Sequence, residues 1–104
     1  MGKSVIMIRM NYEKAIRQAN SLEKTANEIK KYVSEIEHIS SSIRHDWTGA
    51  NAEQYLRKLE VVKNNSNTIV SSLSSTAETI KRIAKRTYDA EMEAVNLAKT
   101  RTYL

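Results

Sequence analysis

The tripeptide Trp47-Thr48-Gly49 lies almost at the midpoint of this chain of 104 residues and contains its only tryptophan and one of its two glycines. On either side run long segments without proline, in which apolar residues recur at spacings of three and four. Such spacing is typical of amphipathic helices. A flexible residue between two such segments indicates a turn. The sequence therefore predicts an all-α, antiparallel helical hairpin that reverses at this tripeptide.

The expected elements fill the whole chain. We expect a single domain over residues 1–104, with helix one over about 11–44, a turn over 45–50 and helix two over about 51–100. Asn11 is the expected N-cap of the first helix, with Glu13 favourable in its first turn. Asn51 and Gln54 form a pair that resembles a capping box at the start of the second helix.

The register of the hairpin follows from its turn. Residues whose numbers sum to about 95 should lie at the same height, which pairs Val33 with Val62 and Tyr12 with Ile83. Matching apolar layers of this kind support antiparallel packing. Helix one then ends opposite about residue 84. Helix two continues to about residue 100, so we expect it to extend roughly 20–25 Å beyond its partner.

Helix two contains two neighbouring apolar rows. One row comprises Ala52, Tyr55, Leu59, Val62, Ser66, Ile69, Leu73, Thr76, Ile80, Ile83, Thr87, Ala90, Ala94 and Leu97, and the other comprises Leu56, Val70, Ala77, Ala84 and Ala98. A helix in a hairpin has one neighbour within its own chain, so a second row needs a second chain. The sequence predicts a four-helix-bundle dimer whose interface includes Leu56, Val70 and Ala77.

Composition narrows the possible partners. The chain has no cysteine, so a disulfide framework or thiolate metal site is excluded. Its net charge is +5, but the basic residues are spread along the helices. Three of them, Arg17, Arg57 and Arg82, follow an acid by four positions, which favours a solvated helix face over a nucleic-acid footprint. The apolar run near the start is about four residues long, too short for a signal core or a membrane helix. We expect no nucleic-acid partner, no stable membrane insertion and no cleaved signal peptide.

Catalytic chemistry finds no support in the sequence. The two histidines, His38 and His45, are seven residues apart, whereas metal-binding pairs on a helix are usually three or four apart. Glu91 and Glu93 are two apart and face different sides of a helix. Neither a glycine-rich phosphate loop nor a serine-nucleophile elbow is present. We therefore expect a protein that is not an enzyme and that uses no metal and no cofactor.

These features together resemble the WXG family of helical-hairpin proteins of about one hundred residues, which type VII (ESX or Ess) secretion systems of Gram-positive bacteria and mycobacteria handle. The resemblance covers essentially the whole chain. It rests on the length, on the turn Trp47-Thr48-Gly49, on the opening Ala-Asn-Ala-Glu-Gln-Tyr-Leu of helix two (residues 50–56) and on the long helical tail.

The resemblance implies a dimer, formed with a second copy or with a related WXG-like protein, that crosses the membrane folded. It also implies recognition by the secretion ATPase, which reads the turn, here Trp47 and Gly49, together with a C-terminal motif of Tyr, three residues and an acid. This chain departs from that motif, because Met92 stands four residues after Tyr88. Glu91 shares a helix face with Tyr88, so Tyr88 and Glu91 are the candidate export signal.

Three functions remain open from the sequence. The first is a secreted or cell-surface, non-enzymatic substrate or export partner of a type VII system, synthesised in the cytoplasm. The second is a cytosolic chaperone for a larger type VII toxin, which a toxin gene next to this one would favour. The third is a basic hairpin that binds nucleic acid or membranes, which salt-dependent retention on DNA or binding to liposomes would favour.

Overall fold

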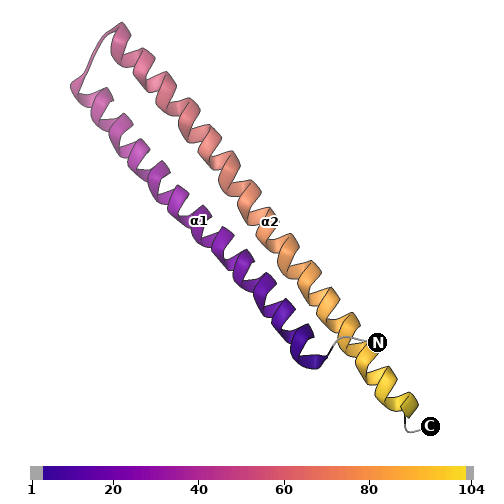
Figure 1. Ribbon diagram of the computed structural model, residues 1–104. Coiled ribbons are helices and arrows are strands. Elements are labelled where there is room, and N and C mark those ends of the chain that lie inside the picture. Colours follow the sequence, from indigo (N-terminus) through magenta and orange to yellow (C-terminus); the bar gives the residue numbers. More distant parts are fainter. Residues whose placement is uncertain (1–3, 103–104) are drawn as a thin grey trace. The chain divides into compact units, whose positions relative to one another are not determined.

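The computed structural model describes residues 4–102, which form two α-helices, α1 (Val5–Asp46) and α2 (Ala50–Thr102), joined by a short link (Figure 1). Within these residues there is no β-strand. The predicted all-α helix-turn-helix hairpin is therefore confirmed. Residues 1–3 and 103–104 of the expected domain lie outside the described residues.

Helix α1 begins six residues before the expected start at Asn11. Ser4 is its N-cap, because the Ser4 hydroxyl oxygen accepts a hydrogen bond from the Met7 amide at 3.1 Å and the Ser4 carbonyl accepts one from Ile8 at 3.0 Å. Serine satisfies these otherwise unpaired amides as well as asparagine does. Ile8, only 2% exposed, shows why the extra turns are stable: the buried side of the helix continues through them.

The link between the helices consists of Trp47, Thr48 and Gly49, at the position that the sequence predicts. The Trp47 amide donates to the Ile43 carbonyl at 2.8 Å and so continues the hydrogen bonding of α1 by one residue. The Gly49 carbonyl then accepts the Glu53 amide at 3.2 Å. Gly49 has a φ of +105°, in the region that side chains disfavour, so the reversal depends on this glycine.

The chain divides into two compact units, and each contains a segment of both helices. The turn unit comprises residues 23–74 and includes the link. The terminal unit comprises residues 1–22 and 75–104, of which 4–22 and 75–102 are described. Each candidate site discussed below lies within a single unit.

Small side chains dominate the interior of both units. In the turn unit the buried apolar residues are Ala26, Val33, Ile43, Ala52 and Val70, and in the terminal unit they are Ile8, Ala19, Ala77 and Ala84. Many of them recur at intervals of seven, as in Ala19–Ala26–Val33 and Val70–Ala77–Ala84, which is the heptad repeat of paired helices. Alanine at the contact lets two helices approach closely, because the distance between helix axes depends on the side chains between them.

This packing corrects the assignment of the two rows on α2. Val70 and Ala77 were expected at a dimer interface, but they are 8% and 0% exposed within the single chain and have almost no area left to lose. Leu56 is half-buried and therefore keeps some accessible area that a dimer could bury. In the row expected to face helix one, Ala52 is buried at 4%, but the large side chains Tyr55, Val62, Ile69, Ile83 and Leu97 are each about half exposed. The row that contains Val70, Ala77 and Ala84 packs against α1, because its small side chains allow the two helix axes to come closer.

Candidate functional site

Trp47, the first residue of the link, is largely exposed. It is 59% accessible to solvent and lies at the edge of a surface hollow of about 350 Å³ in the turn unit. The hollow is lined by His38, Ile39, Ser42, Ile43, Asp46 and Trp47. A large aromatic ring left in water contributes little to the fold and is available for contact with a partner.

The polar groups around the turn form a weak, solvated arrangement. His45 Nδ1 lies 2.8 Å from Asp46 Oδ1, and both side chains are well exposed. His38 is also exposed and lines the hollow. Residues 4–102 contain no group of three or more side chains that could hold a metal ion. The turn therefore presents an exposed aromatic ring beside a solvated His45–Asp46 pair.

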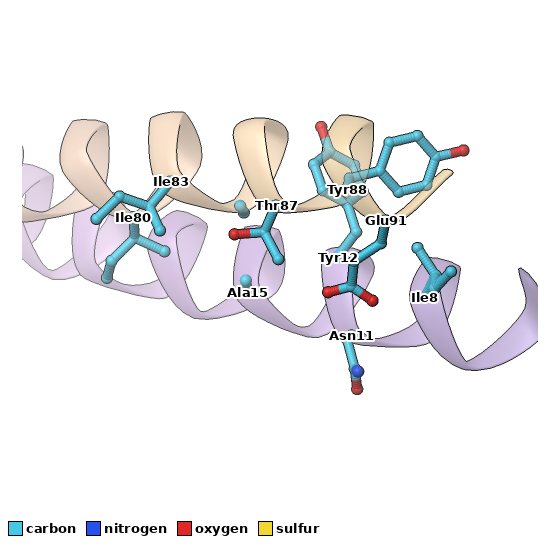
Figure 2. Close-up of a pocket in the computed structure, with 10 residues that line it drawn as sticks. Ile8, Asn11, Tyr12, Ala15, Ile80, Ile83, Thr87, Tyr88 and Glu91 are labelled. Atoms are coloured by element: carbon cyan, nitrogen blue, oxygen red, sulfur yellow. The ribbon is translucent and has the colours of Figure 1, made fainter. Parts of the chain in front are cut away.

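The terminal unit contains the second candidate site, a pocket of about 290 Å³ between the start of α1 and the end of α2 (Figure 2). It is lined by Ile8, Asn11, Tyr12, Ala15, Ile80, Ile83, Ala84, Thr87, Tyr88 and Glu91. The rings of Tyr12 and Tyr88 lie 5.1 Å apart between centroids and are inclined at 45°. This separation is within the range of favourable aromatic pairs.

The structure brings Tyr88 and Glu91, the candidate export signal, to one pocket. Both side chains are half-buried, and Figure 2 shows Glu91 extending from α2 toward α1. The pocket thus combines an apolar floor, two phenol rings and a single carboxylate. Such a site suits a mixed apolar and cationic group of a partner. Met92, which stands where the resemblance implies an acid, is half-buried and does not line the pocket.

Lys85 lies beside Tyr88, one turn earlier in α2. Its Nζ atom lies 5.8 Å from the centre of the Tyr88 ring and 3.0 Å from Asp89 Oδ1. The hydrogen bond to Asp89, and then the charge of that carboxylate, raise the pKa of Lys85 above its ordinary value. The amine is therefore charged at neutral pH and adds a cation beside the ring.

The Tyr12–Tyr88 pair is the feature of this site that the sequence reasoning missed. The register count places Tyr12 opposite Ile83, and both do line the pocket. The Tyr12 ring also reaches Tyr88, five residues further along α2. The register could have predicted this contact, because a tyrosine side chain is long enough to reach a residue about one helical turn away from the one opposite it.

Helix α2 extends beyond α1 within the terminal unit, by less than the sequence predicts. Ile8 and Glu91 line the same pocket, and from there α1 runs back three residues to Val5, whereas α2 runs on eleven residues to Thr102. The excess is about eight residues, or about 12 Å. Residues 96–101 are all exposed. The earlier start of α1 accounts for the shorter extension.

Comparison with known protein families matches residues 7–92 to WXG100, described as proteins of 100 residues with WXG. Searches of curated proteins and of solved structures found no match. No helix within residues 4–102 is long and apolar enough to cross a membrane. The family match includes the link at Trp47-Thr48-Gly49 and the pocket residues through Glu91. The chain therefore belongs to the WXG100 family, small helical proteins that are secreted by type VII systems and typically form dimers.

Proposed function

We propose that this protein is a non-enzymatic substrate or export partner of a bacterial type VII (ESX-like) secretion system and that it leaves the cytoplasm as a folded helical dimer. The observation that carries this proposal is the pocket of the terminal unit, where Tyr88 and Glu91 lie together inside the region matched by the family. In this role the secretion ATPase reads Tyr88 and Glu91 as the export signal. Trp47 and Gly49 form the second recognition element.

The exposed apolar row on α2 supports the dimer. Tyr55, Val62 and Ile69 in the turn unit are spaced by seven residues, as expected for a helix that packs on a further helix. Ile83 and Leu97 continue the same spacing in the terminal unit. Burying this row stabilises the assembly by the usual transfer of apolar area from water. We propose that a second copy or a related WXG-like chain covers it.

Export is tested by comparing culture supernatant with cell lysate, in cells with and without the secretion ATPase. Tyr88→Ala combined with Glu91→Ala should abolish export while the protein remains folded and dimeric in the lysate. Tyr32→Ala, at a tyrosine that is 62% exposed in the turn unit, is the matched control and should be exported normally. Normal export of the double variant as a folded dimer contradicts the assignment of the signal.

Trp47→Ala separates recognition from stability. Because the ring is 59% exposed, its loss should lower the free energy of unfolding by less than about 1 kcal/mol. Export should nevertheless fall strongly if the ring contacts the secretion machinery. A variant that melts like the parent and is still exported contradicts a recognition role for Trp47.

A second candidate function is that of a cytosolic targeting partner for a larger type VII toxin. It is favoured by Met92, which stands where the family's signal has an acid, so that this chain would depend on a signal supplied by its partner. Met92→Glu restores the family's spacing. If the chain depends on a partner, this change should make its export independent of the toxin, whereas it changes little if Tyr88 and Glu91 already suffice.

A further inference from the structure

The outward side of the first turns of α1 carries large apolar side chains. Ile6, Met7 and Met10 are 72%, 52% and 61% exposed. Ile6 and Met10 are four residues apart and therefore lie on one face of the helix, with Met7 beside them. Ile8, by contrast, is 2% exposed and lines the pocket against α2. The three exposed side chains thus lie away from the hairpin contact.

Packing in a four-helix bundle does not account for this exposure. A second hairpin covers the rows that flank the buried row, not the side opposite to it. On α1 the flanking row is represented by Ala15 and Leu22, which are half-buried. Ile6 and Met10 lie on the opposite side of the helix and would stay in water in such a dimer. The exposure of Ile6 and Met10 therefore has a cause other than dimer formation.

Basic side chains continue the same face. Lys14 and Arg17 follow Met10 at four and seven residues, so they extend the face by two turns, and both are exposed. Glu13 is the acid nearest to them on this face. We refer to Ile6, Met7, Met10, Lys14 and Arg17 together as the outer face of α1.

The charge of the whole protein is concentrated in the same unit. Residues 23–74 contain seven basic and seven acidic side chains and are neutral. Residues 1–22 and 75–104 contain ten basic and five acidic side chains, which is the entire net charge of +5. The exposed apolar cluster therefore belongs to the unit that attracts anionic surfaces.

We propose that the outer face of α1 docks on the surface of bilayers that contain anionic phospholipids. Ile6, Met7 and Met10 would enter the boundary between headgroups and acyl chains, while Lys14 and Arg17 contact lipid phosphates. Three apolar side chains bury too little area to hold a protein on a neutral membrane, so attraction to anionic headgroups is required. Docking is peripheral and reversible. It goes beyond the export function and does not depend on it.

Vesicle flotation of the purified full chain tests the proposal. The protein should float with vesicles of phosphatidylcholine and phosphatidylglycerol, stay unbound with vesicles of phosphatidylcholine alone, and dissociate as salt is raised. Equal binding to both vesicle types, or binding to neither, overturns the proposal.

Two double variants test the two halves of the face. Ile6→Ser with Met10→Ser should weaken binding at least about tenfold, because each removes exposed apolar area from the lipid contact. Lys14→Gln with Arg17→Gln should weaken it about tenfold or more, since each basic residue near an anionic surface contributes about a fivefold change. Circular dichroism of each variant checks that the helices are intact. Unchanged binding by either folded double variant overturns the proposal.

The turn unit offers matched controls. Tyr32 and Val61 are 62% and 58% exposed, so Tyr32→Ser with Val61→Ser removes similarly exposed apolar area. Lys30→Gln with Lys31→Gln removes two exposed charges. Both controls should bind vesicles as the parent does. Losses as large as those of the outer-face variants would show that binding is not confined to α1's outer face and would overturn the proposal.

Duplex DNA distinguishes a lipid surface from a general affinity for polyanions. DNA should fail to displace the protein from anionic vesicles at the same salt concentration. Suppose that DNA displaces the protein and that the double variant Ile6→Ser, Met10→Ser binds DNA as the parent does. The basic residues alone would then account for binding, and the proposal would be overturned.

Discussion

The turn unit and the terminal unit are both built from two antiparallel helical segments around small side chains, yet they differ in charge and in surface. The turn unit is neutral, and its Lys63 Nζ lies 3.6 Å from Glu37 on the other helix. The terminal unit carries the whole net charge, the tyrosine pair and the pocket that contains Glu91. In the turn unit the special feature is the backbone of Gly49.

This difference indicates that the reversal of the chain and the pocket depend on different residues. Gly49, with its φ of +105°, determines where the chain reverses. Tyr88 and Glu91 line a pocket on a helix that α1 covers only in part. Substitutions can therefore disturb one property while the other is kept, and the following predictions test that separation from the largest expected effect to the smallest.

The largest effect is expected where the two units are alike. Ala77 is 0% exposed in the terminal unit, so Ala77→Asp places an unpaired charge between the helices and should lower the free energy of unfolding by at least about 3 kcal/mol. Urea denaturation followed by circular dichroism measures the loss. Ala26→Asp, at a residue 2% exposed in the turn unit, should cost a similar amount. Thr76→Asp, at the exposed neighbour, is the control; equal stability of Ala77→Asp and Thr76→Asp would contradict the described core.

The next effect is confined to the turn unit. Gly49→Ala should lower the free energy of unfolding by about 1–3 kcal/mol, because an alanine at a φ of +105° is strained. An added Cβ would meet no atom within 4 Å, so the cost comes from the backbone alone. Thr48→Ala, at the preceding exposed residue, should change stability little. A melting curve of Gly49→Ala that matches the parent would show that the turn does not require this glycine.

A smaller effect is expected in the terminal unit. Tyr12→Ala, Tyr88→Ala and the double variant form a thermodynamic cycle whose coupling energy should be about 0.5–1.5 kcal/mol, as for other aromatic pairs. Tyr32, which is exposed in the turn unit, supplies the control: Tyr32→Ala and Tyr88→Ala should be additive. Additivity of Tyr12→Ala and Tyr88→Ala as well would mean that the two rings do not interact in solution.

The smallest effect concerns the exposed pair of Lys85 and Asp89. Because the pKa of Lys85 is raised in the folded chain, its stabilisation is complete below the ordinary pKa of lysine, about 10.4, and is lost as pH rises through the raised value. Solvent screening keeps this contribution small. Asp89→Asn should lower the pKa of Lys85, which an NMR titration of the side chain measures, with little change in melting temperature. An unchanged titration would contradict the hydrogen bond to Asp89.

Much of the fold could be predicted from the sequence because its signals are local. Trp47 and Gly49 mark the link, and the spacing of apolar residues predicts both helices. The start of α1 could not be predicted as well, because Ser4 and Asn11 are both good N-caps and the choice depends on Ile8 finding cover from α2. For the candidate site, the shared face of Tyr88 and Glu91 follows from their spacing, whereas the contribution of Tyr12 depends on the second helix.

The sequence by itself determined the class of fold, the position of the turn and the family, since helix periodicity, the glycine and the Trp-X-Gly motif are written in neighbouring residues. Only the tertiary structure decided which row of α2 faces α1. Judged by size, Ile69 and Ile83 are the stronger core residues, yet Val70, Ala77 and Ala84 are buried in their place. The reason is that close packing of two helices depends on how near their axes can come, and small side chains allow the nearer approach.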